Sequence, residues 1–137
     1  KDFQQLAAIK RMVKDLNLDL EIIGLPTFRE PDGLAMSSRN VYLSKEERIS
    51  ALSLIGALKL ARKLYVDGEK NAESVIGKAG KFIQGFPYTQ IDYLKICNAF
   101  TLEDVPEIQE NCVMALAVRV GKTRLIDNSV LGEELQA

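Results

Sequence analysis

The stretch DGLAMSSRN, residues 32–40, brings two hydroxyls, one guanidinium and a glycine-bearing turn together. Ser37 and Ser38 can each donate an O–H, and Arg39 is always charged and presents a planar fork to two phosphate oxygens. Backbone N–H groups around residues 33–38 can add an anion-binding nest. These groups can hold the β- and γ-phosphates of a nucleotide while its α-phosphate is attacked, and the loop can close to exclude water.

The same residues also fit an interpretation without chemistry. Asp32 and Gly33 form an ordinary turn signal, and serines ahead of a helix are usually caps. The stretch matches neither a Walker loop nor a dinucleotide-binding glycine fingerprint. Residue types alone therefore leave phosphate binding and a plain turn both open.

Composition narrows the chemistry further. The 137 residues include 18 basic and 19 acidic side chains, and this balance gives no sign of nucleic-acid or anionic-membrane binding. There is no histidine, which excludes Ser-His-Asp and Cys-His catalysis within this chain, and Cys97 and Cys112 alone cannot make a zinc site. We expect buried reduced cysteines, no protein-held metal, no membrane span and a cytoplasmic protein.

Two elements are expected ahead of the loop. Apolar residues recur at intervals of three and four in residues 2–16, which predicts a helix that Asp2 can cap. Residues 18–25 are rich in Leu and Ile and predict a strand. One helix and one strand cannot bury each other, so residues 1–28 are interpreted as the last helix and strand of a Rossmann-like α/β domain. An exposed apolar stripe also predicts self-association of this chain.

The elements after the loop predict a second domain over residues 29–137. Ser44 and Glu47 have capping-box spacing and start a helix that Gly68 can end, and Asn71 can cap another helix through about Gln84. Residues 90–98, 112–120 and 123–131 predict strands, with a type II′ turn at Gly121 and Lys122 and one helical turn within 101–111. The predicted fold class is α+β, with two or more helices packed on a small antiparallel sheet of about three strands. We expect Arg29, Arg48 and Arg62 to be solvated charges.

Two motifs in register carry a resemblance to a known family. The stretch PTFREPDGLAMSSRNVYLS, residues 26–44, resembles the ATP-binding loop of the pantoate–β-alanine ligases, and KDFQQL, residues 1–6, is similar to the start of their pantoate-contacting helix. The later helices and RLIDN, residues 124–128, also fit the C-terminal domain of that family. The resemblance covers the whole chain.

The resemblance implies a two-step ligase. ATP, bound with Mg²⁺, and pantoate give a pantoyl adenylate and pyrophosphate; the amine of β-alanine then displaces AMP to give pantothenate. By the resemblance, Lys1 lies near the transferring phosphate, Asp2 lines the ATP pocket, Gln5 contacts pantoate and Phe28 contacts adenine through its backbone. The implied loop that closes over the nucleotide comprises Met36, Ser37, Ser38 and Arg39, with Lys1, Ser37, Ser38 and Arg39 as the catalytic set and Pro26 and Asn40 as weaker candidates.

Family members are roughly twice as long as this chain. Their N-terminal half carries a histidine motif, most of the parallel sheet, the β-alanine site and the dimer contact. The resemblance therefore implies a homodimeric intact protein and an isolated C-terminal half that is inactive. Two other interpretations remain: the lid domain of a different adenylate-forming nucleotidyltransferase, and a non-catalytic interaction module.

Overall fold

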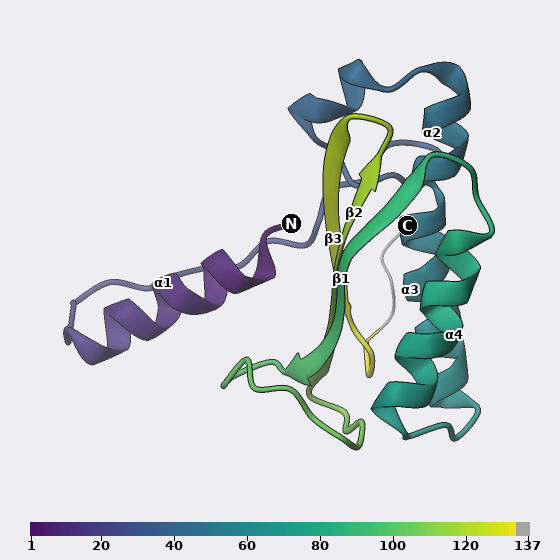
Figure 1. Ribbon diagram of the computed structural model, residues 1–137. Helices are drawn as coiled ribbons and strands as arrows, with labels where there is room; N and C mark the ends of the chain where they lie inside the picture. The colour runs from purple at the N-terminus through teal and green to yellow at the C-terminus, as the bar shows by residue number, and fades with distance from the viewer. Residues whose placement is uncertain (134–137) are drawn as a thin grey trace.

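The computed structural model describes residues 1–133, and its strands form one antiparallel sheet beside two long helices (Figure 1). The sheet order is β1-β2-β3, with each strand paired to the next in the chain. The elements are α1 (Phe3–Asp15), the 3-10 helix η1 (Ser38–Tyr42), α2 (Lys45–Ala51), α3 (Ser53–Val66), α4 (Ala72–Gln84), β1 (Thr89–Asn98), β2 (Cys112–Val120) and β3 (Thr123–Val130).

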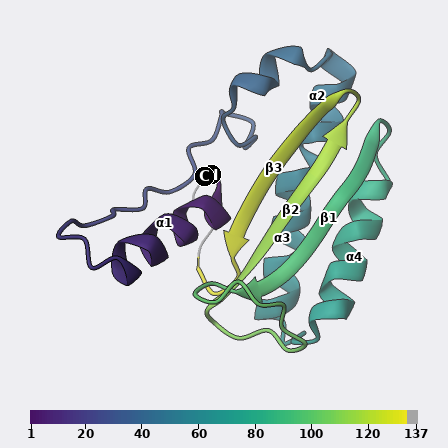
Figure 2. The ribbon, with the colours of Figure 1, turned by 60° about the vertical axis from the view of Figure 1, so that its left-hand side comes forward.

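The core lies between the sheet and the helices α3 and α4, which both cover the same face (Figure 2). β2 is central, and alternate side chains Met114, Leu116, Val118 and Val120 join the fully buried cluster against the helices. The predicted α+β class, with helices on a three-stranded antiparallel sheet, is confirmed. Cys97 and Cys112 are free and buried, as predicted.

Local sequence signals set several element ends. The Ser44 hydroxyl accepts from the N–H of Glu47, whose side chain accepts from the N–H of Ser44, so the predicted capping box forms. Gly121 has φ 58, as the first central position of a type II′ turn requires. A Cβ added at Gly121 would overlap the Glu47 carboxylate, so the hairpin tip packs directly on the start of α2.

Two predicted elements differ from the structure. Residues 44–66 form two helices joined at Leu52, although the apolar spacing runs through the joint. Residues 101–111 contain turns and isolated bridges but no helical turn. Leu102 has φ 61, in the left-handed region, which is incompatible with a right-handed helical turn that starts at Thr101.

The predicted strand at residues 18–25 is also wrong. This stretch forms no strand, and residues 21–27 make no backbone hydrogen bond to any other described residue. A strand exists only by pairing with a neighbour, and the described chain offers this segment none. Helix α1 is formed as predicted, yet it buries no residue and extends away from the sheet in Figure 1. Ile23 and Leu25 are 73% and 80% exposed.

Hydrogen bonds fix the base of the loop at residues 29–40. Asn40 Nδ2 donates to Glu30 Oε1 at 2.5 Å, and Arg48 Nη2 lies 2.6 Å from Glu30 Oε2 and 2.7 Å from Asp32 Oδ2. Arg29 pairs with Asp127 on β3, and both side chains are nearly inaccessible. The prediction of solvated charges is therefore wrong for Arg29 and Arg48, because each has carboxylate partners from distant parts of the chain.

Within residues 1–133, no helix has both the length and the apolar character needed to cross a membrane.

We predict that Arg48→Gln destabilises the fold in a pH-dependent manner. Hydrogen bonds from Asn40 and then Arg48 lower the pKa of Glu30 from its ordinary value of 4.5. A carboxylate with a lowered pKa adds stability above its unfolded pKa, and this contribution is lost as the pH falls through the folded pKa. The gap in free energy of unfolding between parent and variant should therefore be largest above about pH 5 and shrink at lower pH.

Urea unfolding between pH 7 and pH 3 measures this gap. Arg11→Gln is the matched control, since the Arg11–Asp15 pair is 76% and 52% exposed and should contribute less than about 0.5 kcal/mol. An Arg48→Gln effect of equal size at both ends of the pH range would contradict the assignment.

Candidate active site

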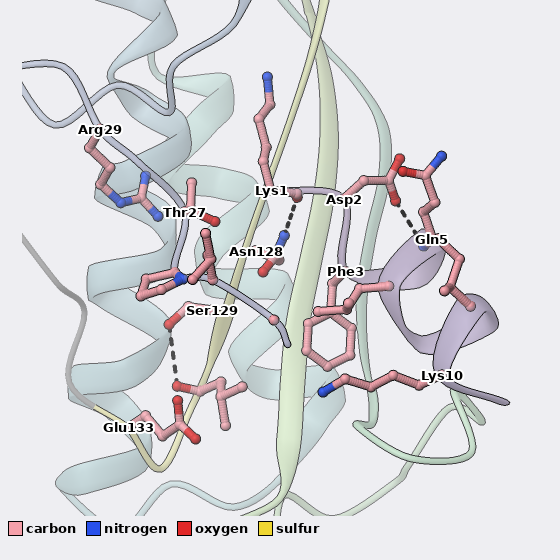
Figure 3. A pocket seen from close by; sticks show the side chains of 16 residues that line it. Lys1, Asp2, Phe3, Gln5, Lys10, Thr27, Arg29, Asn128, Ser129 and Glu133 are labelled. Atoms are coloured by element: carbon pink, nitrogen blue, oxygen red, sulfur yellow. Dashed lines mark hydrogen bonds between the residues drawn. The ribbon is translucent and has the colours of Figure 1, made fainter. Parts of the chain in front are cut away.

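A cleft of about 620 Å³ lies where the start of α1, the segment ahead of the loop and β3 meet (Figure 3). Its volume falls in the range of small-molecule sites. Lys1, Asp2 and Gln5 line it, as does the weaker candidate Pro26. The cleft therefore gathers the residues that the resemblance assigns to the transferring phosphate and to pantoate. Its other lining side chains include Lys10, Thr27, Arg29, Asn128, Ser129 and Glu133.

The start of α1 positions the first residues of the cleft. Asp2 is the N-cap, with extended backbone, and its Oδ1 accepts from the N–H of Gln5 at 3.1 Å. This bond satisfies one of the free N–H groups at the start of α1, and Figure 3 shows the two side chains beside each other. The carboxylate of Asp2 thus has a structural role in addition to any contact with a ligand.

Lys1 is held by its backbone and lies among charges of both signs. Asn128 Nδ2 donates to the Lys1 carbonyl oxygen at 2.5 Å, and in Figure 3 the Lys1 side chain extends away from this bond. Burial has the largest effect on the Lys1 ammonium and lowers its pKa from 10.5. The negative charges of Asp127 and Asp2 oppose this shift, and the positive charge of Arg39 adds to it. Among these charges, the carboxylate of Asp127 has the largest effect on Lys1 and favours its protonated form.

The loop presents only some of its polar groups outward. The Ser37 hydroxyl accepts from the N–H of Arg39 at 3.3 Å and so caps η1, which is the plain structural role that a serine before a helix favours. Ser38 and Arg39 are exposed. Arg39 lines a second cleft of about 580 Å³. Tyr42, Glu47, Lys122, Thr123 and Arg124 complete the lining of that cleft.

Only part of the backbone N–H nest expected around residues 33–38 is available. Gly33 N–H donates to the Glu30 carbonyl, Leu34 N–H to Asp32 Oδ1 and Met36 N–H to the Phe28 carbonyl. These bonds close the loop on itself, so any phosphate contact from this segment has to come from side chains or from residues beyond Met36.

The predicted site residues fall into separate groups. Lys1, Asp2 and Gln5 share the first cleft, whereas Arg39 lines the second. The side chains of Phe28 and Met36 are 71% and 52% exposed and line neither cleft. Among residues 1–133, no three His, Cys, Asp or Glu side chains gather as metal ligands. The arrangement supplies cations on two elements and no strong base, which suits positioning and charge neutralisation.

Sequence reasoning from residue types missed the contribution of β3. Asp127 occupies an inward position in a strand where Leu125 and Ser129 are also buried, and a buried carboxylate requires a partner. That signal was present in the sequence, but it does not identify Arg29, 98 residues earlier, as the partner. Asn128 and Ser129 enter the cleft only because β3 runs beside the start of α1.

Comparison with known proteins supports the resemblance. A family model described as pantoate-beta-alanine ligase matches residues 1–130. The pantothenate synthetases of Syntrophus aciditrophicus and Geobacter sulfurreducens are 60% and 52% identical to the chain, over 98% of its length and 47% of theirs. The chain thus spans about half the length of the curated relatives it matches.

Solved structures agree. The pantothenate synthetase of Thermus thermophilus aligns with a TM-score of 0.89 and 38% identity, over 96% of this chain and 47% of its own. The pantoate-beta-alanine ligase of Francisella tularensis, complexed with beta-gamma ATP and beta-alanine, aligns with a TM-score of 0.59 and 28% identity, over 98% of this chain and 42% of its own. The chain therefore belongs to the pantoate–β-alanine ligase family.

Proposed function

We propose that this chain forms the C-terminal part of an ATP-dependent ligase that joins pantoate to β-alanine through a pantoyl adenylate, releasing pyrophosphate and AMP. The observation that carries the proposal is the cleft that gathers Lys1, Asp2 and Gln5 at the start of α1, with Arg39 exposed on the loop. Two cations on separate elements suit a polyphosphate held between them. The nucleotide and β-alanine named for the Francisella tularensis relative support the same substrates.

The chemistry asks for alignment more than for proton transfer. The carboxylate of pantoate is ionised at neutral pH and attacks the α-phosphate without a general base. Charge then builds on the nonbridging oxygens, where Lys1, Arg39 and the hydroxyl of Ser38 act, with Ser37 capping the short helix that presents them. Mg²⁺ enters with ATP as part of the substrate. Displacement of AMP by the amine is again a matter of positioning.

The remaining assignments follow the same scheme. Gln5 contacts pantoate and Asp2 borders the ATP site; Phe28 and Met36 contact the nucleotide from the loop side. Residues 1–28 belong to a nucleotide-binding α/β domain and residues 29–137 to the lid domain. The proposal includes a homodimer of the intact protein through its N-terminal domain and a cytoplasmic location.

We predict that the 137-residue chain alone forms no pantothenate and binds ATP weakly. Lys1 and Arg39 line different clefts, so this chain by itself does not surround a nucleotide. Calorimetric titration with MgATP and an assay of pantothenate formation test this. A measurable turnover by the purified chain would refute the prediction.

We predict that Arg39→Ala slows adenylation at least about 100-fold, the usual effect of losing one preorganised charge at a developing anion. The assay uses a chimera in which this chain replaces the matching segment of the Syntrophus aciditrophicus enzyme, to which it is 60% identical over 135 residues. Pyrophosphate release with ATP and pantoate reports the first step, and AMP release after addition of β-alanine reports the second.

Arg119→Ala is the matched control for Arg39→Ala. Arg119 is an exposed arginine on β2 with no ion pair to the described residues and lies outside both clefts. Adenylation unaffected by Arg39→Ala would remove Arg39 from the mechanism. A parent chimera that makes no pantothenate would count against the proposed substrates.

A further inference from the structure

We propose that Asp127 and Asn128, consecutive residues on β3, are positioning residues that fix Lys1 and the Arg39-bearing loop relative to each other. The proposal rests on the proposed function for its catalytic consequence, but not for its structural one. Among the described strands, β3 alone has side chains that are hydrogen-bonded to both segments. Asn128 bonds to Lys1 at the cleft, and Asp127 bonds to Arg29 at the base of the loop.

Asp127 fixes the loop side. Its two carboxylate oxygens accept from Arg29 Nη1 at 2.7 Å and from Arg29 Nη2 at 3.0 Å, a bidentate pair with side chains 4% and 2% exposed. Arg29 Nη1 also donates to the Gly33 carbonyl at 3.2 Å. One guanidinium therefore joins both sides of the turn at residues 29–35 to the sheet.

Asn128 fixes the other side. Asn128 lines the cleft, whereas the carboxylate of Asp127 is paired with Arg29 at the base of the loop. Its Nδ2 donates to the Lys1 carbonyl, and its own N–H donates to Asp127 Oδ1 at 2.8 Å. Two adjacent residues thus connect chain segments that are 127 and 98 residues away in sequence.

The pairing also decides which cations face a ligand. Arg29 lines the cleft, but Asp127 and the Gly33 carbonyl occupy its guanidinium, so it is not free to bind phosphate. Lys1 and Arg39 make no ion pair with another described residue and remain available. Asp127 further counteracts the effect of burial and of Arg39 on the pKa of Lys1.

The structural consequence is tested in the 137-residue chain by titrating lysine ¹³Cε signals, with Lys1 assigned from Lys1→Arg. Asp127→Asn removes a negative charge that favours protonated Lys1, so the Lys1 titration should move to lower pH. Asn128→Ala releases the Lys1 backbone into solvent, so its titration should move up toward 10.5. Asn111→Ala is the control, because Asn111 is also half-buried and its side chain makes no hydrogen bond to the described residues.

The catalytic consequence is tested in the chimera. Asn128→Ala should lower kcat for pyrophosphate release about 10- to 100-fold, with KM for ATP changed less than about threefold, because misplacing a bound group lowers the rate more than affinity. Asp127→Asn should also shift the alkaline limb of the pH–rate profile to lower pH. Asn111→Ala should change neither quantity.

The outcomes separate the two proposals. If neither Asp127→Asn nor Asn128→Ala moves the Lys1 titration, the positioning role is wrong, whatever the activity. If Asp127→Asn does not fold, Asn128→Ala decides alone, since its side chain is only half-buried. If these substitutions move the Lys1 titration but the parent chimera makes no pantothenate, the positioning role stands and the proposed substrates are rejected. A kcat for Asn128→Ala within twofold of the parent would reject its catalytic consequence.

Discussion

The buried ion pair between Arg29 and Asp127 is the constraint on which the site depends. Removing two charges from water is costly, and such a pair is tolerated only when its geometry satisfies both partners. Here the guanidinium makes two bonds to the carboxylate and one to a loop carbonyl, so the pair is well satisfied. An apolar pair of similar size could fill the same space, but it would not fix the direction of the loop.

Local signals in the sequence predicted most of the element ends. Ser44 and Asn71 cap their helices because each side chain bonds to an N–H three residues on, which needs no information from elsewhere. Gly121 sets the hairpin for the same reason. The prediction of a strand at residues 18–25 was wrong because the hydrogen bonds of a strand depend on neighbouring strands. The joint at Leu52 was missed because the apolar pattern continues through it.

The site was predictable in part. Lys1, Asp2 and Gln5 do gather at one cleft, and Ser37 proved to be a cap, as one of the two initial interpretations held. The contribution of β3 was out of reach because an arginine in a loop is solvated by default. Only the topology brings Asp127 to within 2.7 Å of Arg29. Pairings across such separations are properties of the fold, and residue spacing carries little information about them.

The loop at residues 29–40 is attached at both ends: to β3 through Arg29, and to Glu30 and the start of α2 through Asn40 and Arg48. Beyond it, the hairpin tip at Gly121 rests on Glu47. A loop anchored in this way cannot swing by itself without breaking several bonds. Any movement of this loop therefore has to carry with it β3, the start of α2 and, through Asn128, the backbone of Lys1.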